Sequence, residues 1–403
     1  MPMNTFDYKK VKDPQYFRDA RMDAHSDHIY YRTKEEAEEK QSSYRVSLNG
    51  LWKFHYAKNY ADVVAGFEKE DYCCVGWDDI KVPAHIQMEG YDVPQYANVQ
   101  YPWEGHEDIH PGEIPEQFNP VASYVKYFTV PKQMQGKRLF VSFQGAESGL
   151  AVWLNGTFIG YSEDSFTPSE FELTDAVKDG ENKLAVQVFK WTASSWCEDQ
   201  DFYRFSGIYR EVYLYTVPDV HVYDLQIRAI PDETLKKAEF EIKTIAWGKG
   251  SVHIVLSKDG QTVLEDSKSL GAVAAESGSR NMDADAKNND DGKGAAAQAD
   301  SLDIFTWTVE NPILWSAEDP QLYDLVLEVS DENGTLQEVI PQKIGFRRFE
   351  MKDGIMTLNG KRIVFKGVNR HEFSSVTGRC VSEAELRKDL TTMKQNNINA
   401  IRT

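Results

Sequence analysis

The sequence IVFKGVNRHE, at residues 363–372, joins a run of apolar side chains to a polar end. Residues 382–397 follow with a helical pattern, and NAIRT at residues 399–403 begins a second apolar run. This order is typical of a parallel βαβ unit, whose strands need neighbours on both sides and helices over both faces. The segment 346–403 therefore predicts the first unit of a truncated (β/α)₈ TIM barrel, which needs about 250 residues when complete.

Upstream of this unit, residues 44–218 contain many short strands separated by turns. Residues 121–130 alternate, residues 138–143 read as a buried strand, and residues 182–191 alternate strictly. Asn155-Gly156 stands between two apolar runs and is the strongest short signal for a hairpin. Strands of this length and spacing predict a jelly-roll β-sandwich.

Residues 219–345 form a second strand-rich unit. Strands are expected over residues 238–245 and 322–329, with turns at Asp259-Gly260 and Asn333-Gly334. About seven strands in a segment of this size are typical of an immunoglobulin-like β-sandwich. The predicted fold is thus mostly β and multidomain.

Two segments differ from these sandwiches. Residues 1–43 are charged, with a short helix expected near residues 34–40, and we expect an N-terminal arm that lies on the first sandwich. Residues 272–300 hold no aromatic residue and a single valine. Such a segment cannot bury enough surface to offset its ordering entropy, so we expect a disordered insertion in the second sandwich.

Composition limits the partners. The net charge is −19, with 64 acidic against 45 basic residues, which disfavours nucleic acid and anionic membranes. The 4 cysteines match no metal-binding spacing and are expected to be reduced thiols. The first residues lack the apolar core of a signal peptide, and no apolar run reaches the length of a membrane span. These features predict a cytoplasmic protein.

Five motifs carry a family resemblance. They are WDDIKVP at residues 77–83, YANVQYPW at 96–103, EDQDFYRFSGIYREV at 198–212, NPILWS at 311–316 and GVNRHE at 367–372. In this order and spacing they resemble the family 2 glycoside hydrolases. The stretch at residues 96–103 is more similar to the β-galactosidases of that family than to its β-glucuronidases or β-mannosidases.

The resemblance implies hydrolysis of terminal β-galactosides such as lactose, with retention. In the family, the acid/base Glu, the nucleophile Glu and the main Mg²⁺ ligands sit on later barrel strands. This sequence ends before those segments, so we expect the 403-residue chain to be inactive alone. It would act with a complementing C-terminal segment, and the family suggests a homo-oligomer. The alternative is a non-catalytic carbohydrate-binding or complementing fragment, and a β-glucuronidase or β-mannosidase is the weaker enzyme alternative.

Four residues match site positions of the family. The resemblance implies that Asp201 binds a galactose hydroxyl and a Na⁺ ion, and that Asn98 binds the sugar. His371 would contact substrate and transition state, and Arg402 would orient a catalytic carboxylate. The residue chemistry fits, because carboxylates and amides bind sugar hydroxyls and oxygen is the ligand that hard cations prefer.

Each assignment has a structural alternative. Asp201 could form an ion pair with a nearby arginine, Asn98 an Asx-turn, His371 a buried core contact and Arg402 a structural barrel contact. A catalytic pair of Asp199 and Asp201 is disfavoured, because a jelly-roll loop lacks the convergent strand ends of a barrel. Core packing is likewise favoured over sugar stacking for Trp103, Trp191 and Trp196.

Overall fold

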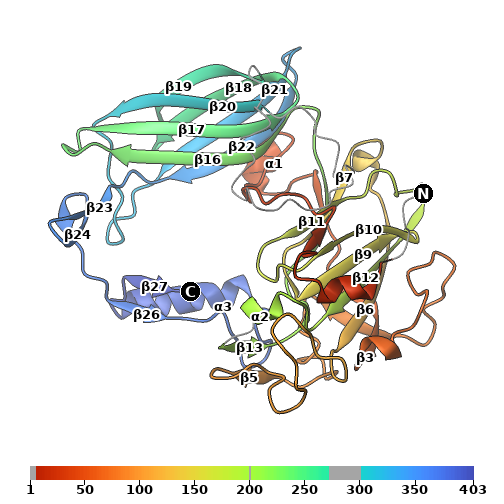
Figure 1. Ribbon diagram of the computed structural model, residues 1–403. Helices are drawn as coiled ribbons and strands as arrows, with labels where there is room; N and C mark the ends of the chain where they lie inside the picture. The colour runs from red at the N-terminus through yellow and green to blue at the C-terminus, as the bar shows by residue number, and fades with distance from the viewer. Residues whose placement is uncertain (1–5, 199–200, 272–300) are drawn as a thin grey trace.

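The computed structural model describes residues 6–198, 201–271 and 301–403, which form two β-sandwiches and a smaller α/β segment (Figure 1). The order of jelly roll, immunoglobulin-like sandwich and barrel start is as predicted. The predicted disorder of residues 272–300 lies outside the described residues and stays a prediction. Among the described residues, no helix is long and apolar enough to cross a membrane.

The jelly roll packs a seven-stranded antiparallel sheet against a four-stranded one. The larger sheet consists, in spatial order, of β1 (Arg18–Asp19), β10 (Thr157–Ser162), β9 (Gly149–Leu154), β12 (Glu181–Phe189), β6 (Val121–Thr129), β3 (Gly50–Ala57) and β4 (Asp78–Val82). The smaller sheet consists of β11 (Ser169–Glu172), β7 (Leu139–Phe143), β15 (Val212–Thr216) and β2 (Arg45–Ser47). Asn155 and Gly156 both have positive φ, at 51° and 81°, which is the type I′ hairpin that their sequence predicts.

The seven-stranded sheet is covered on both faces. Leu184 and Val186 of β12 join the core between the two sheets, whereas Ala185 and Phe189 join a second cluster on the outer face. The N-terminal segment supplies Val11 to that outer cluster. The strict alternation of residues 182–191 therefore does not mark a solvated face, because the N-terminal segment and loop residues such as Phe67 and Ile114 cover the outer face.

Two short ladders, two short α-helices and three 3₁₀ turns complete the first sandwich and its surroundings. The ladders join β5 (Gln95–Ala97) to β13 (Phe202–Arg204) and β8 (Ala146–Glu147) to β14 (Gly207–Ile208). The α-helices α1 (Lys34–Glu39) and α2 (Ser195–Glu198) are short, and 3₁₀ turns span Tyr8–Lys12, Tyr60–Asp62 and Lys132–Met134.

The immunoglobulin-like sandwich has the predicted seven strands within the described residues. One sheet contains β16 (His221–Pro231), β17 (Lys237–Trp247) and β20 (Ser301–Glu310). The other contains β19 (Gln261–Leu270), β18 (Gly250–Lys258), β21 (Tyr323–Asp331) and β22 (Leu336–Ile344). Inward side chains of both sheets form one core, as the alternating burial of β17 and β21 shows.

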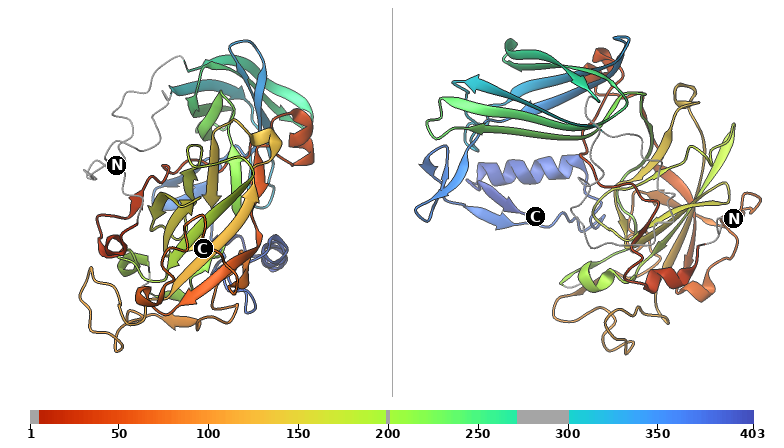
Figure 2. Two further views of the ribbon diagram at one scale, coloured as in Figure 1. Left: turned by 90° about the vertical axis from the view of Figure 1, so that its right-hand side faces the viewer. Right: turned by 45° about the horizontal axis from the view of Figure 1, so that its top comes forward.

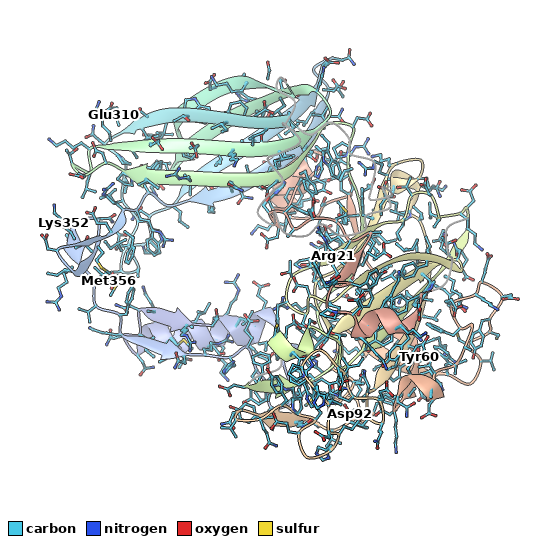
Figure 3. All side chains as sticks on the ribbon, viewed as in Figure 1. Arg21, Tyr60, Asp92, Glu310, Lys352 and Met356 are labelled. Carbon is cyan, nitrogen blue, oxygen red and sulfur yellow. The ribbon has the colours of Figure 1, made fainter. Side chains whose placement is uncertain are left out.

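The third segment begins with a small sheet of β23 (Phe349–Lys352), β24 (Ile355–Leu358) and β25 (Lys361–Arg362). Lys352 and Met356 lie on it at the opposite side of the molecule from Tyr60 (Figure 3). A parallel pair, β26 (Gly367–Asn369) and β27 (Ala400–Arg402), follows with α3 (Glu383–Gln395) between its strands. Ser382 and Glu385 close a capping box at the start of α3, in agreement with the helix predicted over residues 382–397.

The strand predicted over residues 363–368 is shifted and shorter in the structure. Only residues 367–369 pair with a neighbour, through three rungs to residues 400–402. Apolar character alone does not make a strand, because each rung needs a partner that donates and accepts hydrogen bonds. Val364 and Phe365 consequently remain half exposed beside β26.

The N-terminal segment contacts both sandwiches. Tyr31 forms a bridge with Val339 of β22, and the Tyr44 hydroxyl donates to the carbonyl of Gln337 at 2.8 Å. On the jelly-roll side, His25 Nε2 lies 2.7 Å from Glu170 Oε2 of β11. Two further views show this segment passing between the sandwiches (Figure 2). It therefore links the two sandwiches as well as lying on the first.

The His25–Glu170 pair gives this link a pH dependence. Burial lowers the pKa of His25, but the hydrogen bond and negative charge of Glu170 outweigh it, so the pKa rises above its ordinary 6.5. A raised histidine pKa stabilises the folded state fully below the unfolded pKa, and this stabilisation is lost as pH rises through the folded pKa.

His25→Gln is expected to lower the free energy of unfolding by about 1–3 kcal/mol at pH 6, the range for a charged hydrogen bond. Thermal unfolding at pH 6 and pH 9 should show the wild-type advantage shrinking at pH 9. An equal advantage at both values would contradict this origin.

Candidate sugar-binding site

The ladder between β5 and β13 brings together two residues that the sequence separates by about one hundred positions. Phe202 pairs with Ala97, Tyr203 with Tyr96 and Arg204 with Gln95. Asp201 directly precedes Phe202, and Asn98 directly follows Ala97. In an antiparallel ladder the next rung would place these residues opposite each other, so Asn98 and Asp201 lie at the same end of the ladder.

Asp201 is exposed and hydrogen-bonded. Its Oδ1 accepts a hydrogen bond from the Tyr96 hydroxyl at 2.8 Å. That bond raises the pKa of Tyr96, because the carboxylate stabilises the protonated phenol. Asp201 has a φ of 54°, a left-handed conformation that aspartate tolerates better than most residues and that turns the chain into β13. Asp199, which the disfavoured hypothesis pairs with Asp201 as a catalytic residue, lies outside the described residues.

His371 reaches the same place from the barrel segment. It lies two residues beyond β26, and its ring centroid is 5.9 Å from that of Phe202 and 6.1 Å from that of Tyr203. Both contacts are edge-to-face, and His371 itself is exposed rather than buried in a core. Asp201 and His371 therefore both contact the β5–β13 ladder, Asp201 through Tyr96 and His371 through Phe202 and Tyr203, and Asn98 directly follows β5.

Arg402 is the last residue of β27, in the parallel pair of β26 and β27. It pairs with Asn369 at the last rung of β26 and β27, and its carbonyl accepts from the backbone nitrogen of Arg370 at 2.9 Å. Its side chain is exposed at the carboxyl end of β27, the end at which barrel enzymes place their active sites. The neighbouring Arg370 is structural, since its guanidinium forms hydrogen bonds of 3.0 and 2.8 Å to Asp389 of α3.

The tryptophans near Asn98 form an aromatic cluster. Trp103 and Trp191 are buried, which confirms that both are core residues. Trp196 is partly exposed; its Nε1 donates to the Glu113 carbonyl at 2.6 Å, and its ring lies 4.6 Å from that of Tyr101. Tyr101 in turn stacks on Trp103 at 5.1 Å and donates to the Trp196 carbonyl at 2.9 Å. This cluster fixes the loop that carries Asn98 to α2.

A buried ion pair, which the sequence analysis did not predict, supports the same loop. Lys190 Nζ lies 2.6 Å from Asp92 Oδ2, and the two side chains are only 1 % and 2 % exposed. Gln87 also donates to Asp92, at 2.8 Å, and to the Ser206 hydroxyl, at 2.9 Å. Asp92 lies three residues before β5 in the lower part of the jelly roll (Figure 3). This network therefore fastens the segment before β5 to the end of β12 and to the segment that follows β13.

The described residues contain no group of three or more His, Cys, Asp or Glu side chains that could hold a metal ion. Asp201 offers one anionic oxygen ligand, which suits a hard cation as one member of a larger ligand set.

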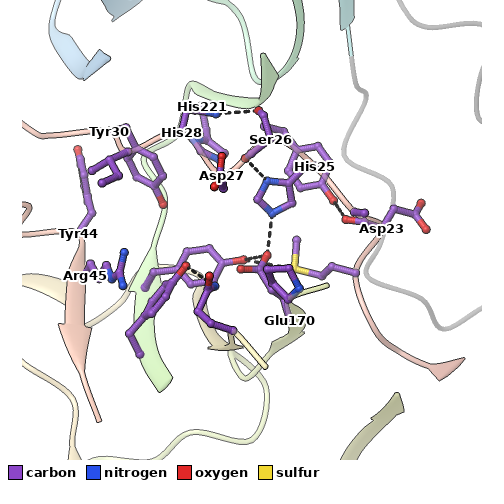
Figure 4. A pocket seen from close by; sticks show the side chains of 18 of the residues that line it. Asp23, His25, Ser26, Asp27, His28, Tyr30, Tyr44, Arg45, Glu170 and His221 are labelled. Atoms are coloured by element: carbon purple, nitrogen blue, oxygen red, sulfur yellow. Dashed lines mark hydrogen bonds and ion pairs between the residues drawn. The ribbon is translucent and has the colours of Figure 1, made fainter. Parts of the chain in front are cut away.

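A separate pocket of about 90 Å³ lies where the N-terminal segment meets the two sandwiches (Figure 4). Its lining includes His25, Glu170 and His221, but none of the four predicted site residues. His28 also lines it, and burial lowers the pKa of this histidine to about 3, so its ring is neutral. The pocket is therefore distinct from the surface around Asn98 and Asp201.

Three family models match consecutive parts of the chain. The sugar binding domain of the glycosyl hydrolases family 2 matches residues 46–218, the model described as glycosyl hydrolases family 2 matches residues 220–347, and the family's TIM barrel domain matches residues 349–403. Together they account for both sandwiches and the barrel start.

Individual relatives agree with this assignment. A β-galactosidase of Halalkalibacterium halodurans is 52 % identical over 98 % of this chain, and a β-galactosidase large subunit of Lactobacillus helveticus is 39 % identical over 98 %. The chain spans 37 % and 61 % of the lengths of these relatives. A solved structure of β-glucuronidase 2 from Bacteroides uniformis matches with a TM-score of 0.69 at 20 % identity. The match covers 89 % of this chain and 39 % of the β-glucuronidase, and it supports the fold only. On the matches of all three domain models and these relatives, the chain belongs to glycosyl hydrolase family 2.

Proposed function

We propose that this chain forms the galactose-binding part of a β-galactosidase, which hydrolyses terminal β-galactosides such as lactose with retention. The observation that supports the proposal is that Asp201 and His371 both contact the β5–β13 ladder, through Tyr96 and Phe202, and that Asn98 directly follows β5. The β-galactosidase relatives, up to 52 % identical, favour a galactoside over a glucuronide or mannoside.

The three side chains offer complementary hydrogen bonds to a sugar. The Asp201 carboxylate accepts from a hydroxyl, the Asn98 amide both donates and accepts, and the His371 imidazole can do either according to its tautomer. Tyr96 holds one carboxylate oxygen of Asp201, which leaves the other oxygen for a ligand. Arg402 is proposed to orient a catalytic carboxylate through a charge-assisted bond.

Hydrolysis with retention needs two carboxyl groups about 5–5.5 Å apart, one as nucleophile and one as acid/base. In the family these groups belong to later barrel strands. We therefore propose that this chain is inactive alone and acts with a complementing C-terminal segment. The large-subunit relative supports a two-chain arrangement in principle, and a homo-oligomer remains part of the proposal.

The resemblance implies two cations, Na⁺ and Mg²⁺, and this chain would contribute a ligand to the Na⁺ ion. Asp201 fits a Na⁺ ion as one oxygen ligand, and the ion would supply a positive charge beside the sugar hydroxyls. Mg²⁺ is proposed only for the complete enzyme, with its main ligands on the later barrel strands. A cytoplasmic location is part of the same proposal and is supported by the four free cysteines.

The proposal is tested by binding and by turnover. D-Galactose should bind the purified chain with a millimolar dissociation constant in Na⁺ buffer, and D-glucuronate and D-mannose should bind more weakly. Asp201→Asn should weaken galactose binding about tenfold or more, the loss of a charged hydrogen bond. Asp232→Asn, on the second sandwich, is the matched control and should bind as wild type.

Release of nitrophenol from a β-galactoside should be absent for the chain alone and should appear when the remaining segment of a relative is added, with Mg²⁺ and Na⁺ present. Turnover by the chain alone that Asp201→Asn abolishes would refute the assignment of the carboxylates. Preference for glucuronate or mannose would refute the substrate.

A further inference from the structure

The loop that connects β26 to α3, residues 370–382, enters the jelly roll. We name it the anchor loop. Ser374 and Gly378 close it with two backbone hydrogen bonds of 2.7 and 2.9 Å. Gly378 has a φ of 63°, and a Cβ there would meet the His85 ring at 2.8 Å, so only glycine allows this approach. The Cys380 thiol donates to the Tyr209 carbonyl at 3.1 Å. The loop that begins with Arg370 and His371 is therefore fixed to the jelly roll.

Arg379 is the deepest residue of the anchor loop. It is 8 % exposed and forms an ion pair with Glu147 of β8, which is 3 % exposed. The guanidinium carbon lies 4.6 Å from the ring centroid of Phe202, 5.3 Å from that of Tyr209 and 5.7 Å from that of Phe205. Within the described residues, Nε and Nη1 of Arg379 have no hydrogen-bond partner, and these rings surround the cation instead.

A neutral histidine lies beside the Arg379 guanidinium. His85 stacks on Phe205 and Tyr209 at 4.3 and 5.1 Å. Burial, and then repulsion from Arg379, lower the pKa of His85 to about 2, so this ring is neutral. His85 therefore adds no positive charge beside the Arg379–Glu147 ion pair.

Phe202 joins this buried pair to the site. Its ring contacts the Arg379 guanidinium at 4.6 Å and the His371 ring at 5.9 Å. Phe202 directly follows Asp201 and pairs with Ala97, which precedes Asn98. A buried ion pair adds little net stability, because well-packed apolar side chains of similar volume would fill the same space as well. What the pair adds is a fixed geometry, since a planar guanidinium accepts few orientations among rings and a carboxylate.

We propose that Arg379 is a positioning residue of the sugar site, which acts through Phe202 and Glu147 to hold Asp201 and His371 within reach of the same sugar. The identity of the sugar rests on the proposed function, whereas the geometric role does not. Arg379 itself does not contact the sugar.

The test removes both charges and keeps the volume, with Arg379→Met and Glu147→Leu combined in one chain. The matched control combines Arg138→Met with Glu172→Leu, because Arg138 also pairs with a glutamate, at 2.8 Å, and lies over an aromatic ring, that of Trp247, at 4.7 Å. Thermal unfolding, the ring-proton NMR shifts of His371 and D-galactose titration are measured for all three chains.

We expect the Arg379/Glu147 double variant to unfold near the wild-type temperature. Its His371 protons should lose the ring-current shift from Phe202 and Tyr203, and galactose should bind about tenfold more weakly or worse. The control should keep both wild-type values. Unchanged His371 shifts in a folded double variant would overturn the proposal and leave Arg379 as core packing only.

A second variant covers the case in which the double variant does not fold. Arg379→Lys keeps the charge opposite Glu147 but loses the planar group, so the same loss of His371 shift is expected, and wild-type shifts and affinity in this variant would overturn the proposal. If the wild-type chain binds no galactose, the proposed substrate fails, while the His371 shifts still decide whether Arg379 positions the site.

Discussion

Replacing Lys190 by methionine is expected to lower the free energy of unfolding by about 3–5 kcal/mol, the cost of leaving one partner of a buried ion pair alone. Both side chains of the Lys190–Asp92 pair are at most 2 % exposed, so water cannot solvate the remaining carboxylate. The Gln87 amide would still donate to Asp92, but a neutral amide cannot replace an ammonium. Urea unfolding followed by tryptophan fluorescence gives the difference.

Two controls separate burial from charge loss. Lys178→Met breaks the exposed pair with Glu70 and should cost less than about 1 kcal/mol. Combining Lys190→Met with Asp92→Leu removes both buried charges and should recover most of the loss. A single Lys190→Met variant within about 1 kcal/mol of wild type would show that Asp92 reaches solvent or another cation. Because Asp92 precedes β5, the single variant should also weaken galactose binding.

The second large effect concerns Gly207, in the Phe205-Ser206-Gly207 part of the motif at residues 198–212. Its φ is 108°, and an added Cβ would meet the Tyr124 hydroxyl at 2.9 Å and Ile86 Cγ2 at 3.0 Å. Gly207→Ala should cost about 2–6 kcal/mol, as the sum of about 1–3 kcal/mol for the backbone and about 1–3 kcal/mol for overpacking. Differential scanning calorimetry should show a lower Tm.

Gly136→Ala is the matched control. Gly136 also has positive φ, at 74°, but nothing lies within 4 Å of an added Cβ. It should therefore show the backbone cost alone, and the difference between the two variants measures the crowding at β14. Equal losses for both variants would mean that Tyr124 and Ile86 move aside freely.

The elements that the sequence predicted are those whose signal is local. Asp259-Gly260 makes the expected hairpin because both residues take positive φ, at 52° and 79°, with no help from the rest of the fold. The short charged helix near residue 34 begins at a threonine whose side chain accepts from the Glu36 backbone nitrogen, again a local interaction. Asn98 and Asp201 were identified through family motifs, and their placement at one ladder end follows from a pairing that no local pattern shows.

The buried charges were beyond the reach of sequence reasoning. Glu147 and Arg379 stand 232 positions apart, and each lies in a stretch without hydrophobic periodicity. Lys190 follows an alternating strand and would be expected to face solvent, yet its ammonium is enclosed. Burial and pairing of such charged side chains depend on which segments meet in the tertiary fold. The sequence alone identifies neither the ion-pair partner nor the loss of water around the charge. The same reason kept Phe202 from being recognised as the link between the two halves of the site.

The ion pair between the anchor loop and β8 has a consequence for how such proteins can recombine. Glu147 belongs to the sugar-binding domain and Arg379 to the barrel, so a hybrid that takes these two domains from different proteins would keep the ion pair only if each parent supplied its own charge. A hybrid that inherits only Glu147 would carry an unpaired acid in its interior, and one that inherits only Arg379 an unpaired cation. The pair therefore sets a condition for exchanging either domain, because the incoming domain must supply the charge that its partner domain needs.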